Sequence, residues 1–149
     1  MDEKLYKFGI IFYSRNASSK DICKDIVHWL QERSITFALE ENSQLEDFSL
    51  LEYLKIDQLA RESEFLLVIG GDGSILRASR HCARYDTILV GLHRGTTGFL
   101  TQLTPENAFE GMQRLVDGPK YYTIQKRMML QTSVVREGKK ITSFFGLND

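Results

Sequence analysis

The sequence predicts an α/β fold, in which a parallel β-sheet is flanked by helices and followed by a β-hairpin. Two short apolar runs, 65–69 and 87–90, each lead into a glycine-rich loop, and a helical pattern lies between them. Strand, helix and strand in this order form a right-handed crossover with parallel strands. A length of 149 residues with 42% apolar content suffices for one domain with a core, or for one domain plus part of another.

The first elements follow from apolar patterning. The run Phe8–Tyr13 predicts a buried strand, and a helix is expected from about Ser18 to Arg33, with a serine as N-cap. A short second strand is expected at 35–39. The segment Glu40–Leu54 carries five acidic residues and no basic one, which predicts a solvated loop or a surface helix.

The first glycine loop, Gly70-Gly71-Asp72-Gly73-Ser74, follows the most apolar strand and opens a helix predicted over 74–85. Glycines let backbone N–H groups face outward, and a helix start adds unpaired N–H groups and partial positive charge, so the loop suits a phosphate. A carboxylate in such a loop repels phosphate unless it binds a metal or accepts a proton from an attacking hydroxyl. For this motif alone, the alternative is a turn Asp that bonds its own backbone.

A second glycine loop, 91–100, follows the strand expected at 87–90. In this Rossmann-like arrangement both loops leave the carboxyl ends of parallel strands and therefore share one edge of the sheet. Open α/β sheets bind their ligands at that edge. The pair of loops favours a nucleotide or phosphate site over two structural turns.

The C-terminal part changes pattern. Thr104-Pro105-Glu106 predicts a helix start with Thr104 as N-cap, and Gly118-Pro119 predicts its end. Two strands, 121–135 and 140–147, then surround a polar turn without an intervening helix, which predicts an antiparallel hairpin. We therefore expect an α/β nucleotide-binding domain over residues 1–119, and at 120–149 the start of a β-rich C-terminal domain that is truncated.

Composition excludes several classes of protein. The net charge of −1 gives no basic field for nucleic acid, and the apolar runs fall far short of the ~20 residues that cross a bilayer. Cys23 and Cys82 are isolated, with no disulfide or zinc spacing, and no residue is assigned as a metal ligand. With no signal or transit peptide at the start, we expect a cytoplasmic protein that binds neither membrane nor nucleic acid.

Four motifs, in this order along the chain, resemble those of the NAD kinase family. They are Gly-Gly-Asp-Gly-Ser at 70–74, Gly-Leu-His-Arg-Gly-Thr-Thr-Gly-Phe-Leu-Thr at 91–101, Arg-Met-Met-Leu at 127–130 and Leu-Asn-Asp at 147–149. The first motif also resembles those of diacylglycerol kinases and 6-phosphofructokinases. The Gly-Phe-Leu-Thr end of the second loop and the terminal Asn-Asp separate the NAD kinases from these relatives, and the sequence resembles the N-terminal half of such an enzyme.

The resemblance implies an enzyme that transfers the γ-phosphoryl group of ATP to the 2′-hydroxyl of the adenosine ribose of NAD, giving NADP, with a divalent metal such as Mg²⁺ as cofactor. It implies that Asp72 is the catalytic acid/base residue and that Phe99 lines the nucleotide pocket. The remaining residues expected to bind substrate or nucleotide are Gly71, Gly73, Arg77, Asn148 and Asp149. His93 stands where many family members have Asn, which leaves its role open.

Family members continue into a β-rich second domain and assemble as homo-oligomers, dimers or tetramers. We therefore expect the activity in the parent protein and an inactive isolated chain. Two alternatives stay open: another small-molecule kinase with the Gly-Gly-Asp-Gly motif, acting on a lipid or sugar phosphate, and a non-catalytic nucleotide-binding module. Against a phosphofructokinase, the loop after the first strand, Tyr13–Ser18, has no glycine.

Overall fold

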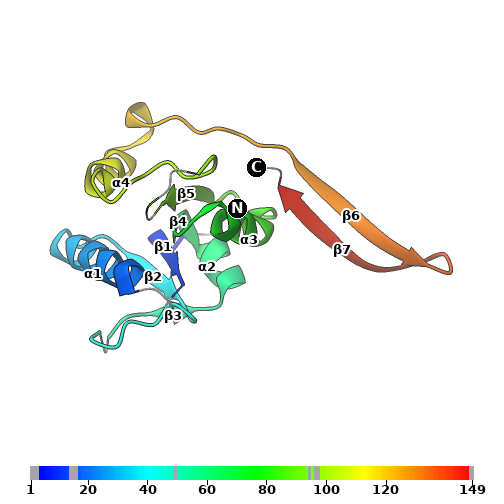
Figure 1. Ribbon diagram of the computed structural model, residues 1–149, viewed down its shortest axis with the longest axis horizontal. Coiled ribbons are helices and arrows are strands. Elements are labelled where there is room, and N and C mark those ends of the chain that lie inside the picture. Colours follow the sequence, from blue (N-terminus) through cyan, green and yellow to red (C-terminus); the bar gives the residue numbers. More distant parts are fainter. Residues whose placement is uncertain (1–3, 14–16, 49, 94, 96–97, 148–149) are drawn as a thin grey trace.

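The computed structural model describes residues 4–13, 17–48, 50–93, 95 and 98–147. Among these residues, five parallel strands form one sheet in the order β3-β2-β1-β4-β5 (Figure 1). Their bounds are β1 Tyr6–Phe12, β2 Phe37–Glu40, β3 Tyr53–Leu54, β4 Ser63–Ile69 and β5 Ile88–Leu92. The apolar run of β4 lies in an interior strand of the sheet, between β1 and β5, where both faces are covered.

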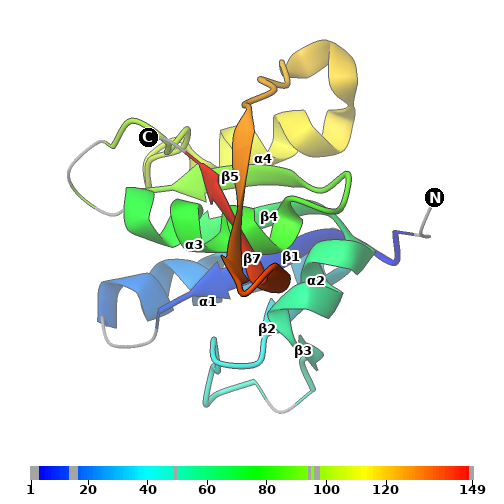
Figure 2. The same cartoon turned by 90° about the vertical axis from the view of Figure 1, so that its right-hand side faces the viewer.

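Helices cover both faces of the sheet (Figure 2). Helices α1, Ala17–Glu32, and α4, Ala108–Asp117, pack on one face, where their side chains join Phe8 and Phe65 in one buried cluster. Helices α2, Ile56–Glu62, and α3, Asp72–Cys82, pack on the other face against a second cluster. The predicted α/β class, a parallel sheet flanked by helices and followed by a hairpin, is confirmed.

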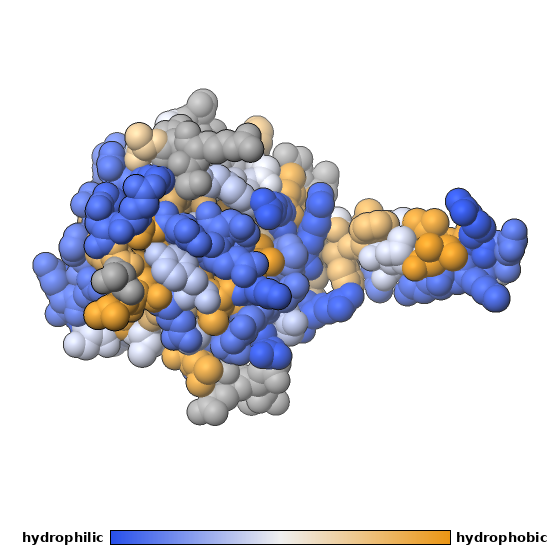
Figure 3. Space-filling model, turned by 90° about the horizontal axis from the view of Figure 1, so that it is seen from below, coloured by the Kyte–Doolittle hydropathy of each residue, from blue (hydrophilic) through white to orange (hydrophobic). Residues whose placement is uncertain are grey.

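The hairpin extends away from the α/β body (Figure 1). A short 3₁₀ turn, Pro119–Tyr121, follows α4, and an irregular segment leads to β6, Met129–Arg136, which pairs antiparallel with β7, Lys139–Leu147. Glu137 and Gly138 have φ values of 49° and 76°, which is the geometry of a two-residue hairpin turn. Apolar side chains gather on the protruding strands (Figure 3) and are exposed: Leu130, Val134, Val135, Ile141 and Phe144.

The acidic segment Glu40–Leu54 is a loop over most of its described length, one of the two predicted forms, but its two ends belong to the sheet. Glu40 is the last residue of β2 and only 4% exposed, and Tyr53–Leu54 form the edge strand β3. The carboxylate of Glu40 accepts hydrogen bonds from the backbone and side-chain N–H groups of Asn42, at 3.1 and 2.6 Å. Local partners of this kind let a charged residue enter the interior, and a count of acidic residues cannot detect them.

Three further expectations are wrong in position. Helix α4 begins at Ala108 rather than after Thr104, because Asn107 Oδ1 accepts the Thr104 N–H at 2.8 Å and closes a turn there. Gly91 belongs to strand β5, so the second loop starts two residues later than expected. The first hairpin strand begins at Met129, since the preceding segment has no partner strand among the described residues. Helix α2 is an element that the sequence patterns did not predict.

Candidate functional site

The two glycine loops lie side by side at the carboxyl ends of β4 and β5. The Gly70 N–H donates a hydrogen bond to the Leu92 carbonyl oxygen at 2.9 Å, so the loops begin at the same level of the sheet. Helix α3 starts at Asp72, with Gly71 as its N-cap residue and no side-chain cap. The N-terminal N–H groups of α3 therefore face the sheet edge where the sequence predicted a phosphate site.

The carboxylate of Asp72 joins the two loops. Its Oδ2 accepts the backbone N–H of Phe99 at 2.8 Å, and its Oδ1 accepts that of Leu100 at 3.0 Å. The alternative of a turn Asp that bonds only its own backbone is therefore wrong, since both donors lie more than 25 residues further along the chain. A carboxylate oxygen can accept two hydrogen bonds, so Asp72 retains capacity for a substrate hydroxyl.

Gly98 gives the Asp72 carboxylate its space. A Cβ atom added at Gly98 would lie 2.1 Å from Asp72 Oδ1 and 2.6 Å from its Cγ, distances at which one of the two groups must move. Sequence reasoning used Gly98 only as part of the Gly-Phe-Leu-Thr motif and did not assign it to the site. The motif was the signal in the sequence that could have indicated Gly98. The carboxylate that occupies the space next to Gly98 belongs to Asp72, in the first glycine loop.

Gly71 and Gly73 are not required by the geometry of the chain itself. Gly71 has a φ of −96°, Gly73 is absent from the residues with positive φ, and a Cβ atom at either would meet nothing within 4 Å. Backbone strain therefore does not explain these two glycines. Open space above both residues is what the approach of a ligand to the backbone needs, so their binding role stays a prediction.

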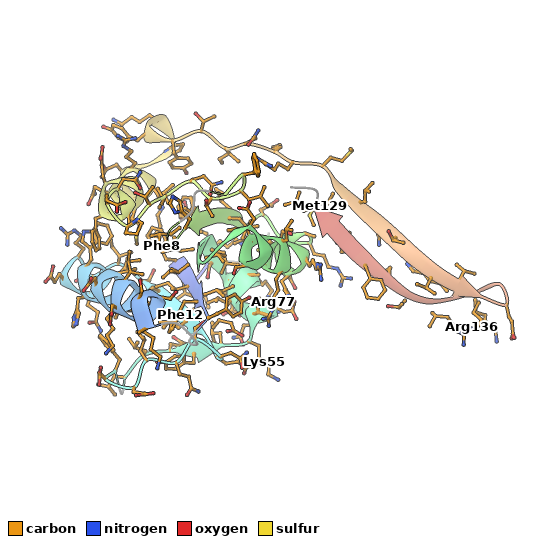
Figure 4. The ribbon with its side chains drawn as sticks, viewed as in Figure 1. Phe8, Phe12, Lys55, Arg77, Met129 and Arg136 are labelled. Carbon is orange, nitrogen blue, oxygen red and sulfur yellow. The ribbon has the colours of Figure 1, made fainter. Side chains whose placement is uncertain are left out.

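Arg77 and Phe99 are both exposed at or near this edge. Phe99 is 88% exposed, although its backbone N–H donates to the Asp72 carboxylate. Arg77 lies on α3 (Figure 4). Its guanidinium carbon is 5.2 Å from the centre of the Tyr13 ring. Asn148 and Asp149, the other two residues expected to bind NAD, lie outside the described residues.

His93 follows β5 and is only 6% exposed. Its Nδ1 lies 3.4 Å from the Gly95 backbone nitrogen, and its Nε2 has no hydrogen-bond partner among the residues that the structure describes.

Burial raises the pKa of the Cys23 and Cys82 thiols to about 12, which keeps them protonated and unsuited to nucleophilic chemistry.

No group of three His, Cys, Asp or Glu side chains that could hold a metal ion occurs in the described part of the chain. Within the same residues, no helix is long and apolar enough to cross a membrane.

An open parallel sheet, with two glycine loops joined by a carboxylate at its carboxyl edge, defines an open α/β fold, a class that binds its ligands at this edge. Residues 8–121 match the ATP-NAD kinase N-terminal domain family. The chain belongs to this family.

Curated relatives agree with this family assignment, and a solved structure supports the fold. The chain is 34% identical over 144 residues to the NAD kinase of Pasteurella multocida and 30% identical over 142 residues to that of Mannheimia succiniciproducens, covering 95% of this chain and 46% of each relative. The crystal structure of yeast NADH kinase complexed with NADH matches with a TM-score of 0.74 at 12% identity, over 96% of this chain and 47% of that one, which supports the fold. The chain spans about half the length of the curated relatives it matches.

Proposed function

We propose that the protein to which this chain belongs is an NAD kinase, which transfers the γ-phosphoryl group of ATP to the 2′-hydroxyl of the adenosine ribose of NAD. The observation that carries the proposal is the Asp72 carboxylate, held by the Phe99 and Leu100 N–H groups at the edge where α/β sheets bind nucleotides. Family membership and the names of the curated relatives support the same reaction.

In the proposed reaction, the 2′-oxygen of NAD attacks the γ-phosphorus of ATP while Asp72 accepts the hydroxyl proton. The bond from the γ-phosphorus to the β,γ-bridging oxygen breaks, and ADP leaves with that electron pair. Two backbone hydrogen bonds fix the carboxylate, so it needs no rearrangement before it meets the hydroxyl. Mg²⁺ or a similar cation would neutralise charge on the phosphates. We assign it no ligand among the described residues and propose that it arrives with ATP.

The proposed NAD contacts are those of the family resemblance. The exposed Phe99 ring supplies an apolar face for a nucleotide base, and the Arg77 guanidinium supplies donors for phosphate. Gly71 and Gly73 leave open space for the backbone to approach the ligand. Asn148 and Asp149 complete the proposed set.

We also propose a domain boundary at 119/120, with the hairpin as the start of a β-rich second domain. The change from parallel to antiparallel pairing after α4 and the exposed apolar side chains of β6 and β7 support this division. In the proposal the complete enzyme is a cytoplasmic homo-oligomer, a dimer or tetramer, that binds NAD and ATP. The free thiols of Cys23 and Cys82 are consistent with a reducing compartment.

Assay of the complete protein tests the proposal. We expect NADP to form from NAD, ATP and Mg²⁺, and only background formation with Asp72→Ala. Turnover of a lipid or a sugar phosphate in place of NAD would identify another kinase of the same motif. NAD binding without turnover of any of these substrates would identify a non-catalytic nucleotide-binding module.

A further inference from the structure

Tyr13 and Arg77 come together although they lie far apart in the sequence. Tyr13 directly follows β1, at the carboxyl end of that strand, and Arg77 lies in the second turn of α3. The guanidinium carbon of Arg77 is 5.2 Å from the centre of the Tyr13 ring, within the range of a cation–π contact. Arg77 is exposed and Tyr13 half-buried, so an exposed side chain rests on a ring that is itself partly covered.

Packing and hydrogen bonds fix Tyr13 itself. Its side chain packs against the buried cluster between the sheet and helices α2 and α3. The preceding residue, Phe12, donates its N–H to Ser43 Oγ at 2.9 Å, and its carbonyl oxygen accepts the Ser43 hydroxyl at 2.7 Å. Ser43 is fully buried and its Oγ also lies 3.4 Å from Glu40 Oε2. The end of β1 is therefore held by the loop that follows β2, on the side away from the glycine loops.

The buried Glu40 carboxylate favours a cation next to the Tyr13 ring. Burial raises the pKa of Tyr13, and the Arg77 guanidinium, by its charge and a hydrogen bond, partly offsets the effect, while the Glu40 carboxylate adds to it. The phenol therefore stays neutral near pH 7, and Arg77 rests on an uncharged ring with a buried carboxylate in the same neighbourhood.

From these contacts we propose that Tyr13 is a positioning residue for Arg77 and sets the affinity for the phosphates of NAD. The inference rests on the proposed function, because it takes NAD as the ligand of this edge. Arg77 has five N–H donors, so its contact with the Tyr13 ring and hydroxyl leaves others free to meet phosphate oxygens in a bidentate contact. Without the ring, Arg77 samples many rotamers and must be ordered when the ligand binds.

Matched substitutions in the complete protein test this role. Tyr13→Phe keeps the ring, Tyr13→Leu fills similar space without it, and Arg77→Ala removes the cation. We expect Tyr13→Leu to weaken NAD binding, measured by calorimetry, by about 3- to 10-fold, with a similar rise in KM for NAD and little change in kcat. Tyr13→Phe should retain most of the wild-type affinity. Tyr85→Leu controls for loss of packing, because Tyr85 packs against the same buried cluster but lies beyond the C-terminal end of α3. Thermal melting confirms that each variant folds.

A double-mutant cycle distinguishes positioning from independent effects. If Tyr13 acts through Arg77, the Tyr13→Leu/Arg77→Ala variant should bind NAD no more weakly than Arg77→Ala alone. Fully additive losses, or unchanged NAD affinity in Tyr13→Leu, would overturn the inference while leaving the proposed function intact. A wild-type protein that binds NAD but forms no NADP would refute the proposed reaction, and the calorimetric cycle would still decide the role of Tyr13. A wild-type protein that binds no NAD would refute both.

Discussion

Replacement of Asp72 by Asn and by Ala should separate its chemical role from its structural role. Oδ1 accepts the partly buried N–H of Leu100, and Oδ2 accepts the exposed N–H of Phe99. Asn keeps one oxygen, which we expect to stay on Leu100, while its NH₂ group faces the Phe99 N–H, where water can replace the lost acceptor. Ala removes both acceptors and leaves the Leu100 N–H without one.

The magnitudes follow from that geometry. Asp72→Asn should destabilise the fold by about 1 kcal/mol, near the lower limit for a lost hydrogen bond, and Asp72→Ala by about 2–3 kcal/mol. At roughly 2–4 °C per kcal/mol for a chain of this size, the melting temperature should fall by about 2–4 °C and 4–12 °C respectively. Both variants of the complete protein should lose about 10²–10⁴-fold in kcat, because general-base action is absent from both.

Thermal melting of the 149-residue chain and NADP formation by the complete protein give the two readouts. Asp25→Ala, an exposed carboxylate on α1, serves as the control and should change stability by less than about 0.5 kcal/mol. If Asp72→Ala melted at the wild-type temperature, the carboxylate would not join the two loops in solution. If Asp72→Asn kept wild-type turnover, Asp72 would not be the base.

The remaining predictions concern other parts of the chain. Gly98→Ala should lower both the melting temperature and NADP formation, because its methyl group collides with the Asp72 carboxylate. Gly71→Ala should melt like the wild type and lose only NAD affinity, measured by calorimetry. Equal melting temperatures for the two variants would contradict this prediction. The stability of the fold should decrease above pH 9, because the thiols of Cys23 and Cys82 keep their protons up to about pH 12 in the folded chain and lose them near pH 9 in the unfolded chain. Cys82→Ala should therefore reduce the slope of melting temperature against pH. An unchanged slope would argue against the burial of Cys82. The chain should self-associate in light scattering through its exposed hairpin, and Leu130→Lys/Phe144→Lys should reduce that scattering; a monomeric wild-type chain would refute the prediction.

Local patterns in the sequence determined the class of fold and the two loops. Apolar runs such as 65–69 and the helical spacing between the loops depend on neighbours within a few residues, so they can be found by inspection. The hairpin turn at Glu137-Gly138 is equally local, since two positive φ values are met by the residues of the turn itself. The parallel sheet and the shared edge of the loops then follow from chain topology.

Only the tertiary structure decided which groups meet at that edge. The N–H groups that Asp72 accepts, the space that Gly98 leaves for its carboxylate and the contact of Arg77 with Tyr13 all join residues from different strands and loops. Likewise, the burial of Glu40 depends on β2 lying between β1 and β3, which no composition of the segment reveals. Sequence periodicity specifies which face of an element is apolar, but the partners of a polar side chain depend on the order in which the strands assemble, and that order is a property of the whole chain.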